Sequence, residues 1–163
     1  TGAEFVKPWG SVAGWDPGTK GALVVLLLDD RGQVQSRESV RFSRSTPSDI
    51  VALLTEFRPD FTVLEQVTSY GMGRGSAFKF GTSYGFARGA LLATGCRFDL
   101  VRPQKWQAPF SVPRSEGMQR KRELKAIAQR INPGIPIVLE DADAHLIAEI
   151  ARRYYLDRTR GTG

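Results

Sequence analysis

The order of strand-like and helix-like segments is the feature that most constrains the fold of this chain. Three strand-length segments come first, separated by tight turns: residues 12–16, 21–28 and 33–42. Strand-like and helical segments then alternate: a helix from 46, a strand at 61–67, a helix at 76–94, a strand at 97–101, and helices at 117–131 and 141–156. An antiparallel meander followed by this alternation predicts an α/β domain, a mixed sheet flanked by helices.

The helix that follows the three strands has clear local signals. Thr46 is placed as its N-cap and Pro47 as its first residue.

The chain has 163 residues, which is the length of one domain. We place that domain at 12–156, with a flexible leader at 1–11, of the kind that cloning can add, and a frayed tail at 157–163.

Composition excludes several classes of site. The chain has one cysteine, Cys96, and one histidine, His145, so it can form neither an internal disulfide nor a zinc site built from Cys and His. It has no apolar run of about 18 residues and no visible secretory signal. We therefore expect no membrane segment and a reducing, intracellular compartment.

The positive charge is concentrated in one third of the chain. The formal net charge is +6, and residues 97–130 alone hold nine basic and three acidic residues, which is also +6. Of the 23 basic residues, 17 are arginine, the side chain that binds phosphate through two parallel hydrogen bonds. The charge therefore favours a phosphate or nucleic-acid partner.

Three carboxylates lie where apolar residues are expected. Asp16 ends the first strand, Glu65 lies in the apolar strand at 61–67, and Asp143 lies on the inward stripe of the last helix, in line with Ile147 and Ile150. Burial of a carboxylate is costly unless a cation or a hydrogen-bond donor compensates. Three such residues on separate elements predict a site of oxygen ligands for Mg²⁺ or Mn²⁺.

A fourth ligand can be either Glu140 or Asp141. On a helix that includes these residues, Glu140 lies about 60° around the axis from Asp143, and Asp141 about 160°. This arrangement favours Glu140 as the ligand and Asp141 as a helix cap, and it points His145 away from the site. It requires the helix to begin before Asp141.

Lys121 is also unusual for its position. It lies on the inward stripe of the helix at 117–131, in the first turn, where free backbone N–H groups attract phosphate. Two interpretations stay open: a phosphate contact, or a lysine that extends to solvent.

Five motifs together resemble the RuvC family of Holliday-junction resolvases, within the RNase H and retroviral-integrase superfamily, over roughly Val12 to Tyr155. The motifs, in chain order, are Gly14-Trp15-Asp16-Pro17-Gly18-Thr19, Leu64-Glu65-Gln66-Val67, Ser76-Ala77-Phe78-Lys79-Phe80-Gly81, the spacing from Gly117 to Lys121, and Glu140-x-x-Asp143-Ala144. The resemblance implies an RNase H-like fold with a five-stranded mixed sheet.

The resemblance also implies the reaction. A structure-selective, metal-dependent endonuclease would resolve four-way DNA junctions by paired symmetric nicks that leave 5′-phosphates. Asp16, Glu65, Glu140 and Asp143 would hold two divalent ions, normally Mg²⁺, with Mn²⁺ as a substitute. Lys121 would contact the scissile phosphate. No small-molecule cofactor is expected.

Partners follow from the same resemblance. The protein would be a homodimer on branched DNA, with the helix at 76–94 as the dimer face. It would work in the cytoplasm of a bacterial cell or a phage-infected host. The predicted DNA contacts are Tyr70, Arg74, Lys79, Arg102, Lys105, Arg114, Arg120, Lys121 and Arg122.

Two positions depart from the family pattern. Glu140 stands where the family has Asp or His. Thr68 stands where many members place an aromatic residue at the junction centre, and Tyr70 follows two residues later. The first departure favours Mn²⁺, and the second makes Tyr70 the candidate wedge and leaves the cut-site preference open.

Other functions remain as alternatives. They are another nuclease of the superfamily, acting more broadly on branched DNA or on RNA, and a junction-binding module without activity. A sugar-kinase or actin-like ATPase shares the Asp-x-Gly-Thr pattern of Asp16 to Thr19, but it needs two such domains and a longer chain.

Overall fold

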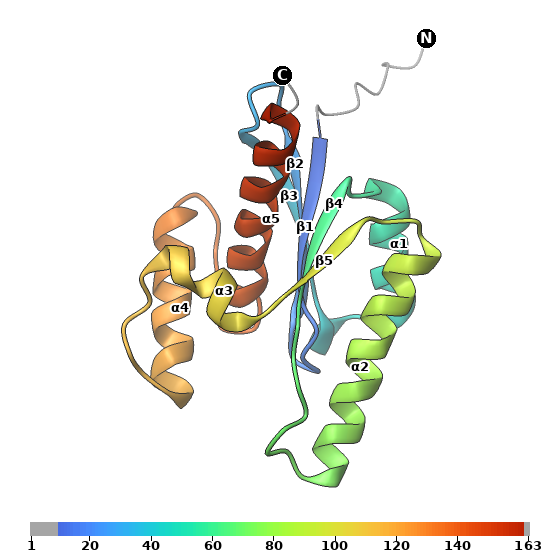
Figure 1. Cartoon of the computed structure of the whole chain (residues 1–163), viewed down its shortest axis with the longest axis vertical. Helices are drawn as coiled ribbons and strands as arrows, with labels where there is room; N and C mark the ends of the chain where they lie inside the picture. The colour runs from blue at the N-terminus through green and yellow to red at the C-terminus, as the bar shows by residue number, and fades with distance from the viewer. Residues whose placement is uncertain (1–9, 162–163) are drawn as a thin grey trace.

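Five strands form one mixed sheet in the order β3-β2-β1-β4-β5 in a computed structural model that describes residues 10–161 (Figure 1). β1 (Gly10–Asp16) pairs antiparallel with β2 (Ala22–Leu28), which pairs antiparallel with β3 (Val34–Arg41). β4 (Phe61–Glu65) and β5 (Phe98–Val101) continue the sheet in parallel with β1. The predicted sheet of three antiparallel strands followed by parallel ones is confirmed.

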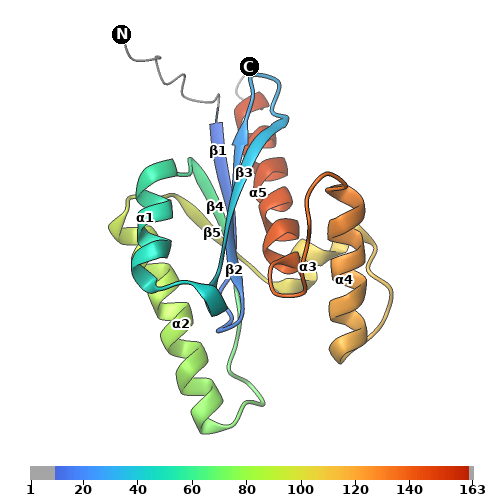
Figure 2. The ribbon, with the colours of Figure 1, turned by 180° about the vertical axis from the view of Figure 1, so that it is seen from behind.

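Helices cover both faces of this sheet, as the two opposite views show (Figures 1 and 2). One face carries α1 (Pro47–Phe57) and α2 (Arg74–Ala93). The other carries α5 (Ala142–Arg160), with α3 (Pro103–Gln107) and α4 (Gly117–Ile131) packed beside it. Two short 3₁₀ turns, at Phe42–Arg44 and Ala108–Phe110, complete the elements of residues 10–161.

Alternating side chains of the central strands build a separate core on each face. Val12, Val24 and Val63 pack toward α5, whereas Ala13, Val25 and Leu64 pack toward α1 and α2. This period of two is the pattern of a sheet buried on both sides, and it explains why β2 and β4 are apolar almost throughout.

The start of α1 confirms the predicted cap. The Thr46 hydroxyl accepts a hydrogen bond from the Asp49 amide, and the Asp49 carboxylate accepts one from the Thr46 amide. This reciprocal pair is a capping box, with Pro47 in the first turn.

Several predicted boundaries were wrong. Gly10 and Ser11, expected in the leader, are buried residues of β1. α5, expected to end at 156, continues to Arg160, so most of the expected tail is helical. The rest of the expected leader, 1–9, and the last residues of the expected tail, 162–163, lie outside the described residues.

Two further details differ from expectation. α3 was not predicted, because a five-residue helix shows no periodicity in sequence. Ile131, expected to face inward, is 37% exposed at the last position of α4. Among residues 10–161, no helix is both long enough and apolar enough to cross a membrane.

Candidate active site

Two acidic side chains lie at the carboxyl ends of neighbouring parallel strands. β1 and β4 pair from Val12 with Phe61 to Trp15 with Leu64, so Asp16 and Glu65 are the next residues of the two strands. Two residues before Glu65, the Val63 side chain faces α5, and two residues before Asp16, a Cβ on Gly14 would point at α5. Because side chains alternate along a strand, both carboxylates point to the α5 side of the sheet.

The turn after β1 holds Asp16 in place. The Gly18 amide donates a hydrogen bond to Asp16 Oδ1 over 3.1 Å. A Cβ on Gly21 would lie 2.2 Å from the Asp16 carbonyl oxygen, so only glycine fits there without displacing the strand. On the other face, Ser83 Oγ of α2 donates to the Pro17 carbonyl over 2.7 Å.

A close contact between β1 and α5 places the third carboxylate. A Cβ on Gly14 would lie 2.1 Å from the Ala148 nitrogen and 2.6 Å from the Ala144 carbonyl oxygen. The helix backbone therefore rests directly on the strand backbone at Gly14. This contact fixes the first turn of α5, which carries Asp143, close to the strand end that carries Asp16.

The pKa values show that the three carboxyl groups form one electrostatic cluster. Burial, with the charge of Asp16, raises the pKa of Glu65 to about 8 and that of Asp143 to about 7. Burial likewise raises the pKa of Asp16. Repulsion among three carboxylates in one place is the situation that a bound cation relieves, which supports the sequence-based choice of these residues.

Trp106 is a site residue that the sequence analysis missed. Its side chain is fully buried, and its indole Nε1 donates a hydrogen bond to Glu65 Oε2 over 2.7 Å. This bond lowers the pKa of Glu65 against the larger effect of burial, and it orients one carboxylate oxygen. The only signal in the sequence was a tryptophan within a basic, polar segment, which does not indicate burial.

Two cations of α4 act on the cluster from outside. The charge of Lys121 lowers the pKa values of Asp16 and Asp143, and the charge of Arg120 lowers that of Asp143. The Lys121 side chain is exposed, while Arg120 is half-buried and donates to the Gln107 side chain. Lys121 thus extends to solvent, and its charge still reaches the carboxylates; its contact with a phosphate stays a prediction.

Glu140 and Asp141 take positions that the helical argument did not predict. α5 begins only at Ala142, so Glu140 precedes the helix, and its carboxylate accepts a hydrogen bond from the Ser43 hydroxyl. The charges that shift the pKa values of the three clustered carboxylates come from other residues. The geometry does not place Glu140 with the cluster, and its role as the fourth ligand stays a prediction.

Asp141 and His145 belong to a different polar group. Asp141 Oδ1 accepts a hydrogen bond from the Val138 amide, and Oδ2 lies 3.6 Å from His145 Nε2. His145 Nδ1 lies 3.0 Å from a guanidinium nitrogen of Arg37. Asp141 stands at the N-cap position of α5, as expected, but its side chain makes no capping hydrogen bond there. His145 faces away from the cluster, as expected.

A divalent metal fits the chemistry of this site but not its present side-chain arrangement. Within residues 10–161, no three acidic, histidine or cysteine side chains are already arranged around one metal position. The clustered carboxylates of Asp16, Glu65 and Asp143 are nevertheless the oxygen donors that Mg²⁺ and Mn²⁺ prefer. Binding would require these carboxylates to reorient toward a shared ion.

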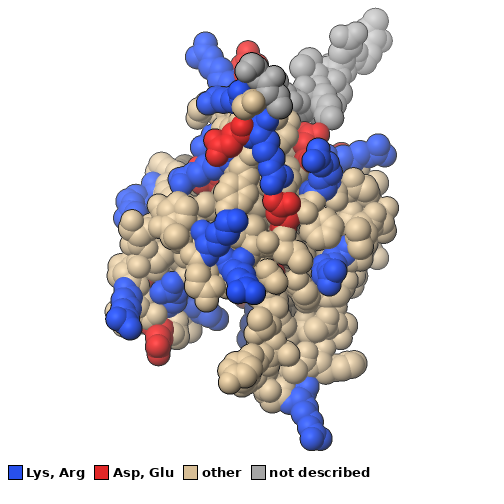
Figure 3. Space-filling view, viewed as in Figure 1, with Lys and Arg blue, Asp and Glu red and all other residues tan. Residues whose placement is uncertain are grey.

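The predicted DNA contacts are distributed around the same end of the molecule. Tyr70 is 96% exposed, in the segment between β4 and α2. Arg120 is half-buried, and the remaining cations are exposed: Arg74, Lys79, Arg102, Lys105, Arg114, Lys121 and Arg122. In Figure 3 the surface is hollowed between the α4 lobe and the projecting end of α2, with Lys and Arg side chains on the lobe and at the tip. This placement is compatible with a polyanion.

The fold can be compared with that of known proteins. No protein-family model and no curated protein matches this chain. RuvC of Thermus thermophilus is similar in structure, with a TM-score of 0.63 and 20% identity over 93% of this chain and 97% of that one. The same protein in complex with a Holliday junction substrate gives 0.62 and 19% over 92% and 96%.

A viral enzyme gives a similar result. The Holliday junction resolvase of fowlpox virus matches with a TM-score of 0.59 and 13% identity, over 88% of this chain and 99% of that one. These identities are low, and the likeness extends over almost the full length of each chain. The protein therefore has the RNase H-like fold of the RuvC and poxvirus resolvases.

Proposed function

We propose that this protein is a RuvC-type, structure-selective endonuclease that resolves four-way DNA junctions. One observation carries the proposal: the buried carboxylates of Asp16, Glu65 and Asp143 come together at the carboxyl ends of β1 and β4 and the start of α5. They do so in a fold shared with a protein solved on a Holliday junction. A DNA-binding module without activity would have no use for such a cluster.

The reaction would be hydrolysis of a phosphodiester bond. Asp16, Glu65 and Asp143, with Glu140 as the predicted fourth ligand, would hold two Mg²⁺ ions, or Mn²⁺ in their place. When bound, the metal would activate a water and stabilise the leaving 3′ oxygen, so that the product carries a 5′-phosphate. Lys121 would contact the scissile phosphate, since its charge already reaches Asp16 and Asp143.

DNA would approach over the exposed cations around this site. Arg102 and Lys105 follow β5, and Arg114, Arg120 and Arg122 lie in or just before α4. Arg74 and Lys79 lie on the first half of α2, and Tyr70 stands before it as the candidate wedge. Phosphate contacts of this kind position the DNA without reading its sequence.

A homodimer would form through α2. Of its 20 residues only Ala87, Ala90 and Leu91 are buried. Phe78 is 78% exposed and Leu92 67% exposed, and a Cβ on Gly81, Gly85 or Gly89 would meet nothing within 4 Å. A second copy packed on this face would cover these side chains and place two sites on a junction with matching two-fold symmetry.

The test is cleavage of a labelled synthetic four-way junction, beside linear duplex DNA and an RNA–DNA hybrid. Each substrate is incubated with Mg²⁺, Mn²⁺ or EDTA, with Asp16→Asn as the matched blank. We expect paired, metal-dependent nicks on the junction alone, and none from the variant.

Other results of the cleavage assay would support a different function. Cutting of the duplex or the hybrid would assign the protein to another nuclease of the superfamily. Junction binding without cutting in either metal would favour the inactive binding module. Equal cutting by Asp16→Asn and wild type would show that the carboxylate cluster takes no part in the reaction.

A further inference from the structure

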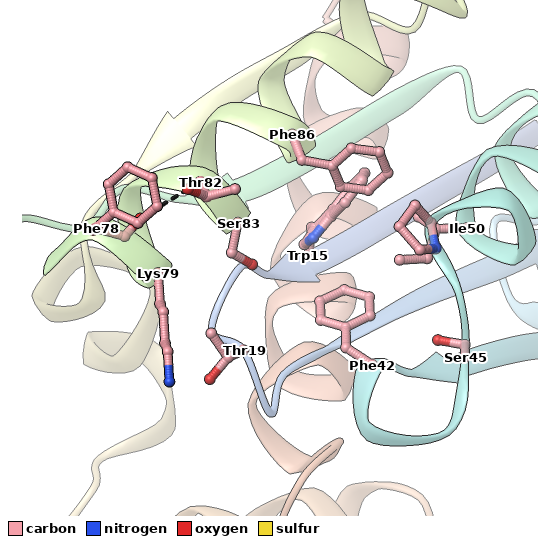
Figure 4. Close-up of a pocket in the computed structure, with 11 residues that line it drawn as sticks. Trp15, Thr19, Phe42, Ser45, Ile50, Phe78, Lys79, Thr82, Ser83 and Phe86 are labelled. Carbon is pink, nitrogen blue, oxygen red and sulfur yellow. Dashed lines mark hydrogen bonds between the residues drawn. The ribbon is translucent and has the colours of Figure 1, made fainter. Parts of the chain in front are cut away.

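A cavity with aromatic walls lies on the face of the sheet opposite the carboxylates. Its volume is about 400 Å³, which is within the range of small-ligand sites. Trp15 of β1 forms part of its wall, and the rings of Phe42 and Phe86 lie 6.1 and 6.3 Å from that of Trp15 between centroids (Figure 4). Among its lining residues only Lys79 is a predicted DNA contact, and none belongs to the carboxylate site.

The rim of the cavity is polar. Lys79 and Thr19 stand together at one end, as Figure 4 shows. Ser83 and Thr82 of α2 already donate their hydroxyl protons to backbone carbonyls, which leaves their oxygens as acceptors. Lys79 is the one charged residue of the lining. Aromatic walls, hydroxyl acceptors and one cation suit a flat ring attached to a phosphate.

Two further hollows share lining residues with the cavity and with each other, in the direction of the carboxylate site. A small hollow of about 190 Å³ shares Thr19 and Lys79 with it. A larger hollow of about 780 Å³ shares Met72 and Phe80 with the small one. The larger hollow extends to Gln66, the residue after Glu65. The shared residues place the three hollows next to one another, and we call this row, from the end of β4 past the start of α2 to the aromatic cavity, the groove.

The groove is suited to a polyanion along its length. Its lining includes three cations, Lys79, Arg102 and Lys105, and no acidic residue. A positively charged track with aromatic side chains is the usual means of holding single-stranded nucleic acid, because every base can stack and every phosphate is attracted. A purely apolar occupant would not need the cations.

We propose that the aromatic cavity between β1, α1 and α2 binds one unpaired base of a DNA single strand that follows this groove from the carboxylate site. The inference rests on the proposed function, since a four-way junction would supply the strand. A base stacked on Phe42 and Phe86, with its phosphate at Lys79, would hold open the DNA next to the cut. The cavity would thus stabilise the unpaired state on which the enzyme acts.

Binding is tested first without any cleavage. The probe is a fluorescein-labelled single-stranded hexanucleotide, titrated with protein in EDTA and followed by fluorescence anisotropy. Thr82→Trp fills the cavity from an exposed position of α2, and we expect it to weaken binding about tenfold, the loss of one stacked base. Lys79→Ala should weaken binding and reduce its salt dependence. Arg88→Ala, an exposed cation of the same helix outside the lining, is the matched control and should bind as wild type does.

A second measurement does not depend on a variant. The same oligonucleotide carrying 5-iodouracil is irradiated with the wild-type protein, and adducts are located by mass spectrometry. Adducts on peptides that contain Phe42 or Phe86 support the cavity. Adducts confined to Tyr70 and α4, or equal affinity of Thr82→Trp and wild type, would overturn the inference.

The two proposals fail separately. A wild-type protein that cuts junctions but does not bind the hexanucleotide in the cavity would refute only the base-binding site. Binding in the cavity without junction cleavage would refute only the resolvase. If Thr82→Trp changes the oligomeric state of the DNA-free protein in sedimentation equilibrium, the cavity belongs to a second copy, and the base-binding proposal is wrong.

Discussion

The two longest helices, α5 and α2, are almost equal in length and opposite in their environment. α5 has 19 residues, of which nine are buried, and it touches the backbone of β1 at Gly14. α2 has 20 residues, of which three are buried, and its first half projects beyond the sheet. The difference separates two roles: α5 holds one carboxylate at a fixed position, whereas α2 leaves exposed the surface on which the proposed dimer and DNA contacts depend.

The largest effect is expected at the start of α5. Asp143→Asn removes one oxygen ligand and one negative charge but leaves the helix and its buried stripe in place. We expect junction cleavage to fall on the order of 1000-fold, about 4 kcal/mol of barrier, while junction affinity in Ca²⁺ or EDTA is retained. Single-turnover cleavage and gel-shift assays measure the two. Unchanged cleavage would remove Asp143 from the site.

The contact between α5 and β1 should be nearly as sensitive. Gly14→Ala places a methyl group where the Ala148 nitrogen already lies, so the helix must move away from the sheet. We expect a loss of about 3 kcal/mol of unfolding free energy or a protein that does not fold. Urea denaturation measures this loss. If Gly14→Ala lowers the unfolding free energy no more than alanine does at an exposed glycine of α2, then α5 is not held as tightly as its contact with β1 indicates.

The fold was largely readable from the sequence because its signals are local. Alternation in the strands, the Thr46 cap and the carboxylates within apolar segments each depend on a few neighbouring residues. Glu140 was harder to place, because the start of α5 depends on a bond between Val138 and Asp141 that no periodicity reveals. Trp106 and the aromatic cavity depend on residues far apart in the chain, so only the folded structure brings them together. The DNA contacts, the dimer and the metal stay predictions.

The charge cluster at the start of α5 should make the metal-free protein sensitive to pH. Glu65 and Asp143 have ordinary pKa values of 4.5 and 3.8, raised in the folded protein to about 8 and about 7. The folded state therefore binds more protons than the unfolded state over this range. Protonation of Glu65 and Asp143 therefore stabilises the folded state. This contribution to the free energy of unfolding is fully present below about pH 4 and is lost as pH rises through 8.

Thermal unfolding in EDTA between pH 5 and pH 8.5 tests this sign. We expect the melting temperature to fall as pH rises, and Asp16→Asn to melt higher than wild type near pH 8 because it removes a repelling charge. Excess Mg²⁺ should restore much of the difference in wild type. A melting temperature that rises over this range would show that the folded protein does not raise the pKa values of Glu65 and Asp143.

Loss of the hydrogen bond that Trp106 donates to Glu65 should have a moderate effect on metal binding. Trp106→Phe keeps an aromatic ring in the core but removes the hydrogen bond to the carboxylate. We expect Mg²⁺ to bind about tenfold more weakly, so that the Mg²⁺ concentration at half-maximal cleavage rises about tenfold. Phe110→Leu, in the same core, is the control and should change stability without changing that midpoint. Equal midpoints for both variants would make Trp106 a packing residue only.

The smallest effect is expected on α2. Gly85→Ala adds a methyl group that meets nothing within 4 Å and replaces a poor helix former. We expect a gain of about 1 kcal/mol in the unfolding free energy of the monomer, measured by urea denaturation at low protein concentration. Any loss would show that this face of α2 is already covered in solution.

The hydrogen bond from Ser83 to the Pro17 carbonyl connects the exposed helix α2 to the turn next to Asp16. Ser83 lies on α2, and Pro17 directly follows Asp16, so the bond crosses from one face of the sheet to the turn that bears a site carboxylate. A displacement of α2 by the proposed second copy or by DNA would pull on that turn. If the proposed function holds, assembly on the substrate and the position of Asp16 would be linked through this one bond, and cutting would be restrained until α2 has met its partner.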